Sequence, residues 1–177
     1  LARQNIPVET FASALTIDEV KQQITRAGAL LDQPARAAAA NGRIDAALAR
    51  LTHGRTGGTT RILPLERRGW VSGRDSLLAD MLARAGATNL GAGANRTGAL
   101  LSLEALIALR PHMMLMSSGR PGADDQGTAL LHHPALGAMV PPGRRMVIAQ
   151  AMTVCAGPML ADALDLLASE LDRAAQN

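Results

Sequence analysis

Apolar residues recur at helical spacing through the first third of the chain. Thr16 and Glu19 have the spacing of a capping box, which predicts that a helix begins there. The pattern continues to about Leu51 and is interrupted only by Pro34, which fits either the first turn of a second helix or a kink in one long helix. Taken as continuous, residues 16–51 predict a helix on the order of 50 Å long. A helix of that length exceeds the width of one domain and is expected to link two bodies.

After this region, short apolar runs alternate with further helical patterns. The polar, glycine-rich stretch 53–60 is the best internal boundary, so we divide the chain into an inter-lobe segment, 1–55, and an α/β lobe, 56–177. Strands are predicted at 61–65, 112–117 and 146–150. Helices are predicted at 75–85, from Ser102 to before Pro111, up to His132, and after Gly157. We expect an α/β fold: a small, mainly parallel sheet with helices on both faces, preceded by the long helix.

The loop after the first predicted strand carries the most informative side chains. It contains Arg67, Arg68 and the only tryptophan, Trp70, and is followed by Arg74. Ligands of α/β proteins bind beyond the carboxyl ends of strands, and arginines near a helix amino terminus favour an anion. The alternatives are a tryptophan in the core and arginines on a solvated surface. Asp75, at the start of the next helix, is expected to cap it.

Two other loops occupy equivalent positions after the second and third predicted strands. Because carboxyl ends of parallel strands meet at one edge of a sheet, we expect the three loops to converge. The candidate ligand-binding residues from the three loops are Arg67, Arg68, Trp70, Ser72, Ser118, Arg120, Met152 and Thr153.

Composition limits the classes of function. A hydrophobic content of 47% supports a core. The sequence contains no run of 18 uncharged apolar residues, so no membrane-spanning helix is predicted. The net charge is +3, but the basic residues are 17 arginines and one lysine scattered among 15 acidic residues. Without a basic run, and with only one Trp and one Phe available for base stacking, nucleic-acid binding is not expected.

Patterns for catalysis and cofactor binding are weak. The glycines at 91, 93 and 98 resemble a dinucleotide fingerprint, but four residues rather than two separate the last pair, and the stretch follows a helix. We interpret it as a connecting loop. No Gly-x-Ser-x-Gly motif surrounds any serine, and the lone Cys155 excludes an intrachain disulfide. We therefore predict neither an enzyme nor a cofactor.

The adjacent histidines His132 and His133 do not predict a metal site. Neighbouring residues on a helix point about 100° apart, and no Asp, Glu or Cys lies nearby in the sequence. We expect them to complement the dipole and carbonyls at the end of a helix, before Pro134.

Several segments, each weak alone, follow one another in an order that resembles a known family. They are Ile6-Pro7-Val8, Thr16-Ile17-Asp18-Glu19-Val20, Gly73-Arg74-Asp75-Ser76-Leu77-Leu78, the stretch 82–89, Ser102-Leu103-Glu104-Ala105-Leu106 to Arg110-Pro111, His133-Pro134-Ala135-Leu136, and Gly157-Pro158. Their order and spacing resemble the carboxyl-terminal portion of the periplasmic substrate-binding proteins of ABC importers for vitamin B12, ferric siderophores and haem.

The resemblance implies that 16–51 is a helix bridging two lobes and that an amino-terminal lobe is absent from this chain. It implies that the 67–72 loop, Ser118 and Met152-Thr153 line a cleft for a metal chelate, with no phenolate ligand for haem iron, since the chain has no Tyr. Asp75 falls on the acidic member of a Gly, basic, acidic, Ser pattern, and the resemblance implies that this member docks on basic residues of a membrane permease. The implied protein is periplasmic and monomeric when full length.

The sequence does not choose among ferric siderophore, haem and cobalamin. Two other readings stay open: a cytosolic α/β enzyme or nucleotide-binding domain that uses the 91–98 loop, and a structural or interaction module.

Overall fold

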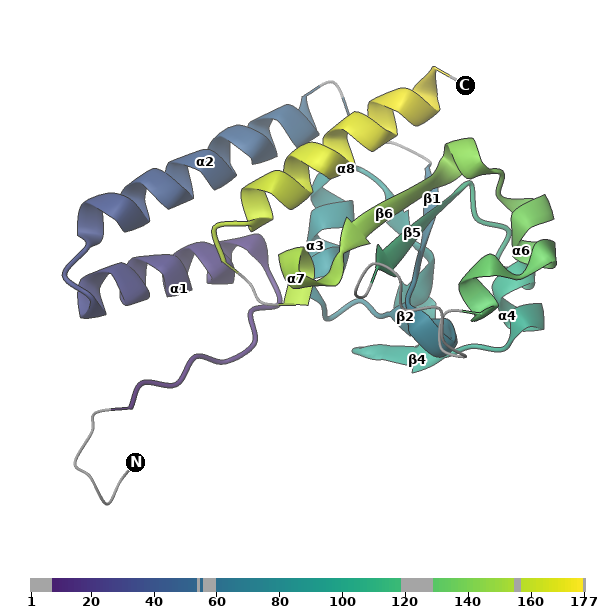
Figure 1. Cartoon of the computed structure of the whole chain (residues 1–177), viewed down its shortest axis with the longest axis horizontal. Helices are drawn as coiled ribbons and strands as arrows, with labels where there is room; N and C mark the ends of the chain where they lie inside the picture. The colour runs from purple at the N-terminus through teal and green to yellow at the C-terminus, as the bar shows by residue number, and fades with distance from the viewer. Residues whose placement is uncertain (1–7, 54, 56–59, 119–128, 155–156, 177) are drawn as a thin grey trace.

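The computed structural model describes residues 8–53, 55, 60–118, 129–154 and 157–176, which form an α/β fold (Figure 1). The helices are α1 (Ile17–Leu30), α2 (Pro34–Thr52), α3 (Leu77–Arg84), α4 (Leu103–Ala108), α6 (Pro134–Met139), α7 (Gln150–Val154) and α8 (Leu160–Ala175). The strands are β1 (Arg61–Leu65), β2 (Trp70–Ser72), β3 (Thr88–Asn89), β4 (Gly98–Leu100), β5 (Met113–Ser118) and β6 (Arg145–Ala149). In this described part, no helix is both long and apolar enough to cross a membrane.

The sheet has the order β4-β2-β1-β5-β6, with β3 pairing beside β1. Strands β1, β5 and β6 are parallel, as is the β1–β3 pair, whereas β2 pairs antiparallel with β1 and β4. The predicted small, mainly parallel sheet is therefore confirmed. The sequence pattern missed β2, β3 and β4 because strands of two or three residues are too short to show alternation.

Both faces of the sheet are covered by helices, as predicted. On one face, Ile62 of β1 and Leu115 of β5 pack into a core shared with α1, α2, α3 and α8. On the other face, Leu63 and Met114 pack with Leu106 of α4 and residues around α6. Burial on both faces explains why β1 reads as a continuous apolar run rather than an alternating one.

The single helix over 16–51 that the resemblance implies is wrong, and the alternative in which Pro34 begins a second helix is confirmed. The chain turns back at Asp32, which has a left-handed φ of 53°, and Pro34 occupies the first turn of α2, so α1 and α2 form an antiparallel hairpin (Figure 1). A Cβ added to Gly28 of α1 would lie only 2.4 Å from Cβ of Ala37 in α2. The small residues let the two helices approach closely, and folding back buries apolar residues that one extended helix would expose.

Helix α2 is fixed to α8 by a row of ion pairs. The two helices run side by side in the same direction (Figure 1), and Arg43 pairs with Asp162 at 2.9 Å. Arg50 donates two hydrogen bonds of 2.8 Å to the carboxylate of Asp165, which raises the pKa of Arg50 and lowers that of Asp165. A third pair joins Arg55, three residues beyond the end of α2, to Asp172 of α8. These pairs hold α2 along α8, and both helices share one apolar core with β1 and β5.

Candidate functional site

The chain reverses direction at the carboxyl end of β1. The amide of Glu66 donates to the carbonyl of Trp70 at 2.7 Å, and the amide of Gly69 donates to the carbonyl of Glu66. Arg68 and Gly69 both have left-handed φ angles, 61° and 82°, which closes the turn within η2 (Arg67–Gly69). Arg67 and Arg68 are exposed on this turn. The predicted open loop over 67–72 is thus partly wrong, because its second half is strand β2.

Packing against a neighbouring segment fixes the turn. A Cβ on Gly69 would lie 2.6 Å from the carbonyl oxygen of Leu101 and 2.9 Å from a methyl carbon of Leu130. The Leu101 amide also donates to the Gly69 carbonyl at 2.9 Å. Arg67 and Arg68 therefore project from a backbone that is held on both sides.

Ser72 is turned inward. The residue is only 7% exposed, and its hydroxyl donates to Oε1 of Glu66 at 2.7 Å. Ser72, one of the predicted site residues, therefore contacts Glu66 at the start of the turn and orients its carboxylate. Glu66 is a site residue that the sequence prediction omitted. The available signal was its position as the first charged residue after the apolar run of β1.

Trp70 is half-buried and lies on β2, beside the edge strand β4. A Cβ on Gly98 of β4 would come within 2.7 Å of Cζ2 of the Trp70 ring, so the indole packs against this glycine. Packing of an aromatic ring over a glycine on the neighbouring strand stabilises an edge pair. Trp70 thus combines the two roles that the sequence left open: part of its ring is packed, and part is accessible.

The other two predicted loops begin at the same edge of the sheet. Register pairs join Leu65 of β1 to Met116 of β5, and Ser118 of β5 to Ala149 of β6, so the carboxyl ends of the three strands lie together. The expected convergence of the strand ends is confirmed for the backbone. Ser118 is described by its backbone as the last residue of β5, and Arg120 lies outside the described residues.

Met152 and Thr153 lie in helix α7 and not in the predicted loop. Met152 packs against the core that contains α3 and α8, and the Thr153 hydroxyl donates to the carbonyl of Gln150 at 3.3 Å. Helix α7 follows β6 directly, so both residues lie at the carboxyl edge of the sheet, as predicted. Met152 contacts the core, however, and Thr153 bonds within its own helix.

The prediction that Asp75 caps the following helix is wrong. Helix α3 begins at Leu77, and Ser76 is the N-cap, because its hydroxyl accepts from the Ala79 amide at 3.1 Å. Asp75 instead accepts a hydrogen bond from Nε of Arg96 at 2.6 Å, while Nε of Arg74 lies 3.8 Å away. The carboxylate is therefore flanked by two guanidinium groups of the same chain.

The glycine-rich stretch 91–98 packs against β2. A Cβ on Gly91 would lie 2.2 Å from the carbonyl oxygen of Ser72, and a Cβ on Gly98 would lie 2.6 Å from that of Val71. These two glycines permit backbone-to-backbone contact within the fold. The connecting-loop interpretation is thereby refined: the stretch contains η3 (Leu90–Gly93) and ends in strand β4.

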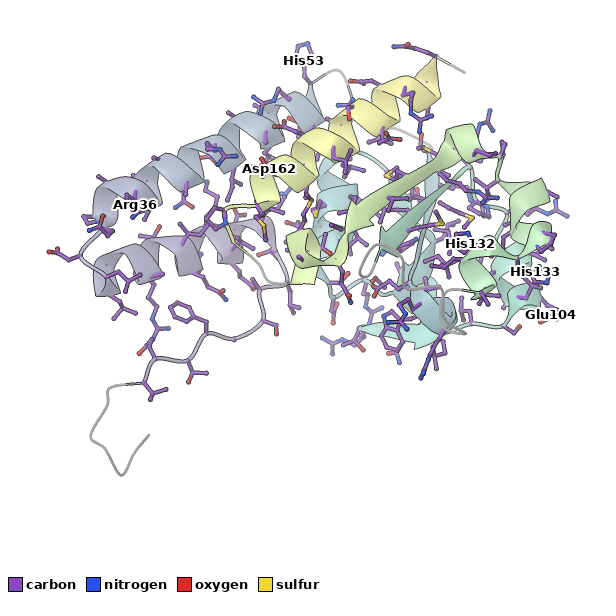
Figure 2. The ribbon with its side chains drawn as sticks, in the orientation of Figure 1. Arg36, His53, Glu104, His132, His133 and Asp162 are labelled. Atoms are coloured by element: carbon purple, nitrogen blue, oxygen red, sulfur yellow. The ribbon has the colours of Figure 1, made fainter. Side chains whose placement is uncertain are left out.

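The histidine pair stands at the start of a helix. Nδ1 of His133 accepts from the amide of Ala135 at 3.2 Å and caps α6, whereas His132 ends η4 (Leu130–His132). The expected contact with carbonyls at a helix end is therefore wrong for His133, because an acceptor nitrogen serves the amides of a helix start. Figure 2 shows both histidines on the side of the sheet that carries α4, with Glu104. Within the described residues, no three His, Cys, Asp or Glu side chains group closely enough to hold a metal ion.

A family model described as periplasmic binding protein matches residues 1–141. The chain belongs to the periplasmic binding protein family. No curated protein matches it.

Solved structures of this periplasmic binding protein fold confirm the resemblance predicted from the sequence. The haem-binding protein RhuT from Roseiflexus sp. RS-1 is 26% identical, with a TM-score of 0.69 over 90% of this chain and 64% of that one. The haem-binding protein HutB of Vibrio cholerae is 20% identical, with a TM-score of 0.78 over 96% and 69%. The vitamin B12-binding protein BtuF of the same organism is 14% identical, with a TM-score of 0.74 over 99% and 69%. This chain thus spans about two thirds of the length of these proteins.

Three hollows in the described surface of this periplasmic binding protein lie away from the 66–72 turn. One of about 350 Å³ is at the amino ends of β1 and β5, between Thr60, His112 and Arg144. Two others, of about 340 and 570 Å³, are lined by α1 and its neighbours. None of these three hollows is lined by Glu66, Arg67, Arg68 or Trp70, which lie at the carboxyl end of β1.

Proposed function

We propose that this chain is part of the substrate-binding component of an ABC importer. In this proposal the protein is periplasmic, binds a metal chelate between two lobes, and delivers it to a membrane permease. The observation that carries the proposal is the placement of exposed Arg67 and Arg68 beside half-buried Trp70, at the carboxyl end of β1, in a chain of this family. A binding role is favoured over the alternative of a cytosolic enzyme because the family consists of binding proteins.

The ligand class follows from the chemistry of this edge. Guanidinium groups bind carboxylates through paired, charge-assisted hydrogen bonds, and an indole face packs against a flat apolar ligand. A carboxylate or catecholate siderophore, the propionates of haem, and the phosphate of a corrinoid all offer such groups. Ser118 at the end of β5 and Met152 and Thr153 after β6 extend the proposed wall, and Ser72 acts through Glu66. Arg120 stays a predicted ligand contact outside the described residues.

Exposed apolar side chains support a second, amino-terminal lobe. Leu30 and Leu31, at the tip of the α1–α2 hairpin, are 56% and 72% exposed, and Val8, Phe11 and Leu15 are exposed on the segment that precedes α1. The hairpin tip and this segment project beyond the sheet (Figure 1). In the proposed arrangement, residues 1–55 lie between the lobes, 56–177 form the carboxyl-terminal lobe, and α2, about 28 Å long, is the stiff connection.

Asp75 is the proposed docking residue for the permease. Its side chain is 29% exposed and lies beyond β2 at the start of α3. A carboxylate in this position can pair with a basic residue of a partner, and an exposed pair of that kind would contribute mainly to orientation and association rate.

Ligand titration of the full-length protein tests the proposal. We expect ferric siderophores, haemin or cobalamin to quench Trp70 fluorescence, and the quenching to be lost in Trp70→Phe. Replacing both Arg67 and Arg68 by Gln should weaken binding at least about tenfold, the loss of one strong charge-assisted pair. Arg144→Gln, an exposed arginine at the opposite edge of the sheet, is the matched control. If the whole panel leaves both fluorescence and melting temperature unchanged, the ligand role is refuted.

A further inference from the structure

The carboxylate of Asp75 is already occupied by its own chain. Arg96 donates from Nε to Oδ2 of Asp75 at 2.6 Å, and the Arg96 side chain is 72% exposed. The other neighbouring cation, Arg74, approaches Oδ1 only to 3.8 Å, beyond hydrogen-bond distance. The two arginines therefore carry the same charge but differ in their contact with Asp75.

The backbone brings Arg96 to this position. The amide of Asp75 donates to the carbonyl of Arg96 at 2.7 Å, and the amide of Gly73 donates to the carbonyl of Thr97 at 3.1 Å. A Cβ on Gly73 would lie 2.3 Å from the carbonyl oxygen of Asn95. Gly73 thus lets the end of the glycine-rich 91–98 stretch run directly beside Asp75, which sets the side chain of Arg96 against the carboxylate.

This pair bears on any interaction that uses Asp75. A guanidinium from a partner must replace Arg96 on Oδ2 or share the carboxylate with it, and Arg96 and Arg74 both repel an approaching cation. Because an exposed ion pair contributes little free energy, the exchange is easily reversible. The pair therefore acts as an adjustable competitor and not as a permanent block.

We propose that Arg96 regulates permease docking by competing intramolecularly for the Asp75 carboxylate. The inference rests on the proposed docking role of Asp75. Docking then requires the Arg96–Asp75 pair to open or to share its carboxylate with the partner, and the strength of that pair modulates the affinity for the permease. The glycine-rich stretch, which the ligand site does not use, acquires a function as the carrier of the competing arginine.

The test uses the full-length protein, loaded with its chelate, and the ABC permease of the same importer reconstituted in nanodiscs. Arg96→Gln should tighten docking about two- to fivefold, the range expected from releasing one exposed ion pair. Arg74→Gln removes the same charge without removing a hydrogen bond, so its gain should be less than half as large. Chelate affinity and melting temperature, measured on each variant, should match the parent protein.

Asp75→Asn separates the two levels of the proposal. In the parent protein it should weaken docking, and in the Arg96→Gln background it should abolish the gain. If Asp75→Asn leaves docking unchanged in the parent protein, the docking role of Asp75 fails, and the competition fails with it. If Asp75→Asn weakens docking but Arg96→Gln gives no gain, a loss, or a gain equal to that of Arg74→Gln, only the competition is overturned.

Discussion

The hydroxyl of Ser72 in β2 donates a 2.7 Å hydrogen bond to Oε1 of Glu66, the residue that follows β1. This bond crosses the turn that carries Arg67 and Arg68, and the amide of Glu66 bonds to the carbonyl of Trp70 inside the same turn. Glu66 thus links both sides of the turn. The proposed ligand wall is organised by a carboxylate and a hydroxyl that face each other within the fold.

Ser72→Ala should lower the free energy of unfolding by about 1–2 kcal/mol, because Glu66 loses its partially buried donor. Urea unfolding measures the change. Ser169→Ala is the control: this exposed hydroxyl on α8 bonds only to the carbonyl of Leu166 in its own helix. Equal effects of the two substitutions would contradict a specific role for the Ser72–Glu66 bond.

Gly98→Ala should destabilise the protein by about 2–4 kcal/mol, since the new Cβ meets the Val71 carbonyl and the Trp70 ring and φ is +140°. The Trp70 emission maximum should shift with it, because the indole must move. In Gly93→Ala, within the same glycine-rich stretch, the added Cβ has open space. That variant should leave both stability and emission nearly unchanged, and an emission shift there would argue against the packing of Trp70 on Gly98.

Gly28→Ala should destabilise the α1–α2 hairpin by about 1–3 kcal/mol, because its Cβ would overlap that of Ala37. Gly42→Ala, in the exposed part of α2 with nothing within 4 Å, should instead stabilise by about 0.5–1 kcal/mol through the higher helix propensity of alanine. Thermal unfolding followed by circular dichroism compares the pair. One continuous helix over 16–51 would predict that both substitutions stabilise.

The Arg50–Asp165 pair gives a pH-dependent prediction. The hydrogen bond from Arg50 lowers the pKa of Asp165, so the pair stabilises the fold above the ordinary carboxyl pKa of about 3.9. The contribution is lost as the pH falls through the lowered value. Asp165→Asn should therefore reduce the melting temperature at pH 7 by no more than about 3 °C. The difference from the parent protein should shrink near pH 2 and in about 1 M salt.

Arg36→Gln provides the comparison for this pair. Arg36 is exposed near the other end of α2 (Figure 2), so its removal should leave the pH dependence of melting unchanged. A loss of stability in Asp165→Asn that persists below the lowered pKa would mean that the aspartate acts through packing and not through its charge.

Asp75→Lys in the full-length protein should weaken permease coupling, measured as chelate-stimulated ATP hydrolysis, because a carboxylate is replaced by a cation beside Arg74 and Arg96. Chelate affinity should stay within about twofold of the parent value, since Asp75 lies beyond β2, apart from the 66–70 turn. An equal loss of coupling and affinity would refute the separation of docking from ligand binding.

Much of the fold could be predicted because its signals are local. Thr16 and Ser102 cap helices where the sequence places them, and their hydroxyls accept from the third residue of each helix. The apolar run likewise predicted β1, and Gly86 predicted the end of α3. The order of strands and helices, and the convergence of β1, β5 and β6 at one edge, follow from these local signals together with the handedness and pairing habits of α/β folds.

The candidate site was only partly predictable. Arg67, Arg68 and Trp70 could be chosen because they follow a strand, whereas the inward direction of Ser72 depends on the antiparallel pairing of β2. The motif singled out Asp75. Its pairing could not be predicted, because Ser76 caps the helix and Asp75 instead pairs with Arg96, 21 positions away in the chain.

By itself, the sequence determined the family, the positions of α3, α4 and α8, and those of the strands β1, β5 and β6. Only the tertiary structure decided that α1 and α2 fold back on each other, that β2 and β4 form an antiparallel edge, and that Asp75 pairs with Arg96. The physical reason is the same in each case. Caps, turns and periodicity act between residues close in the chain, whereas the close approach of Gly28 to Ala37, or of Gly98 to Trp70, depends on which distant surfaces fit together.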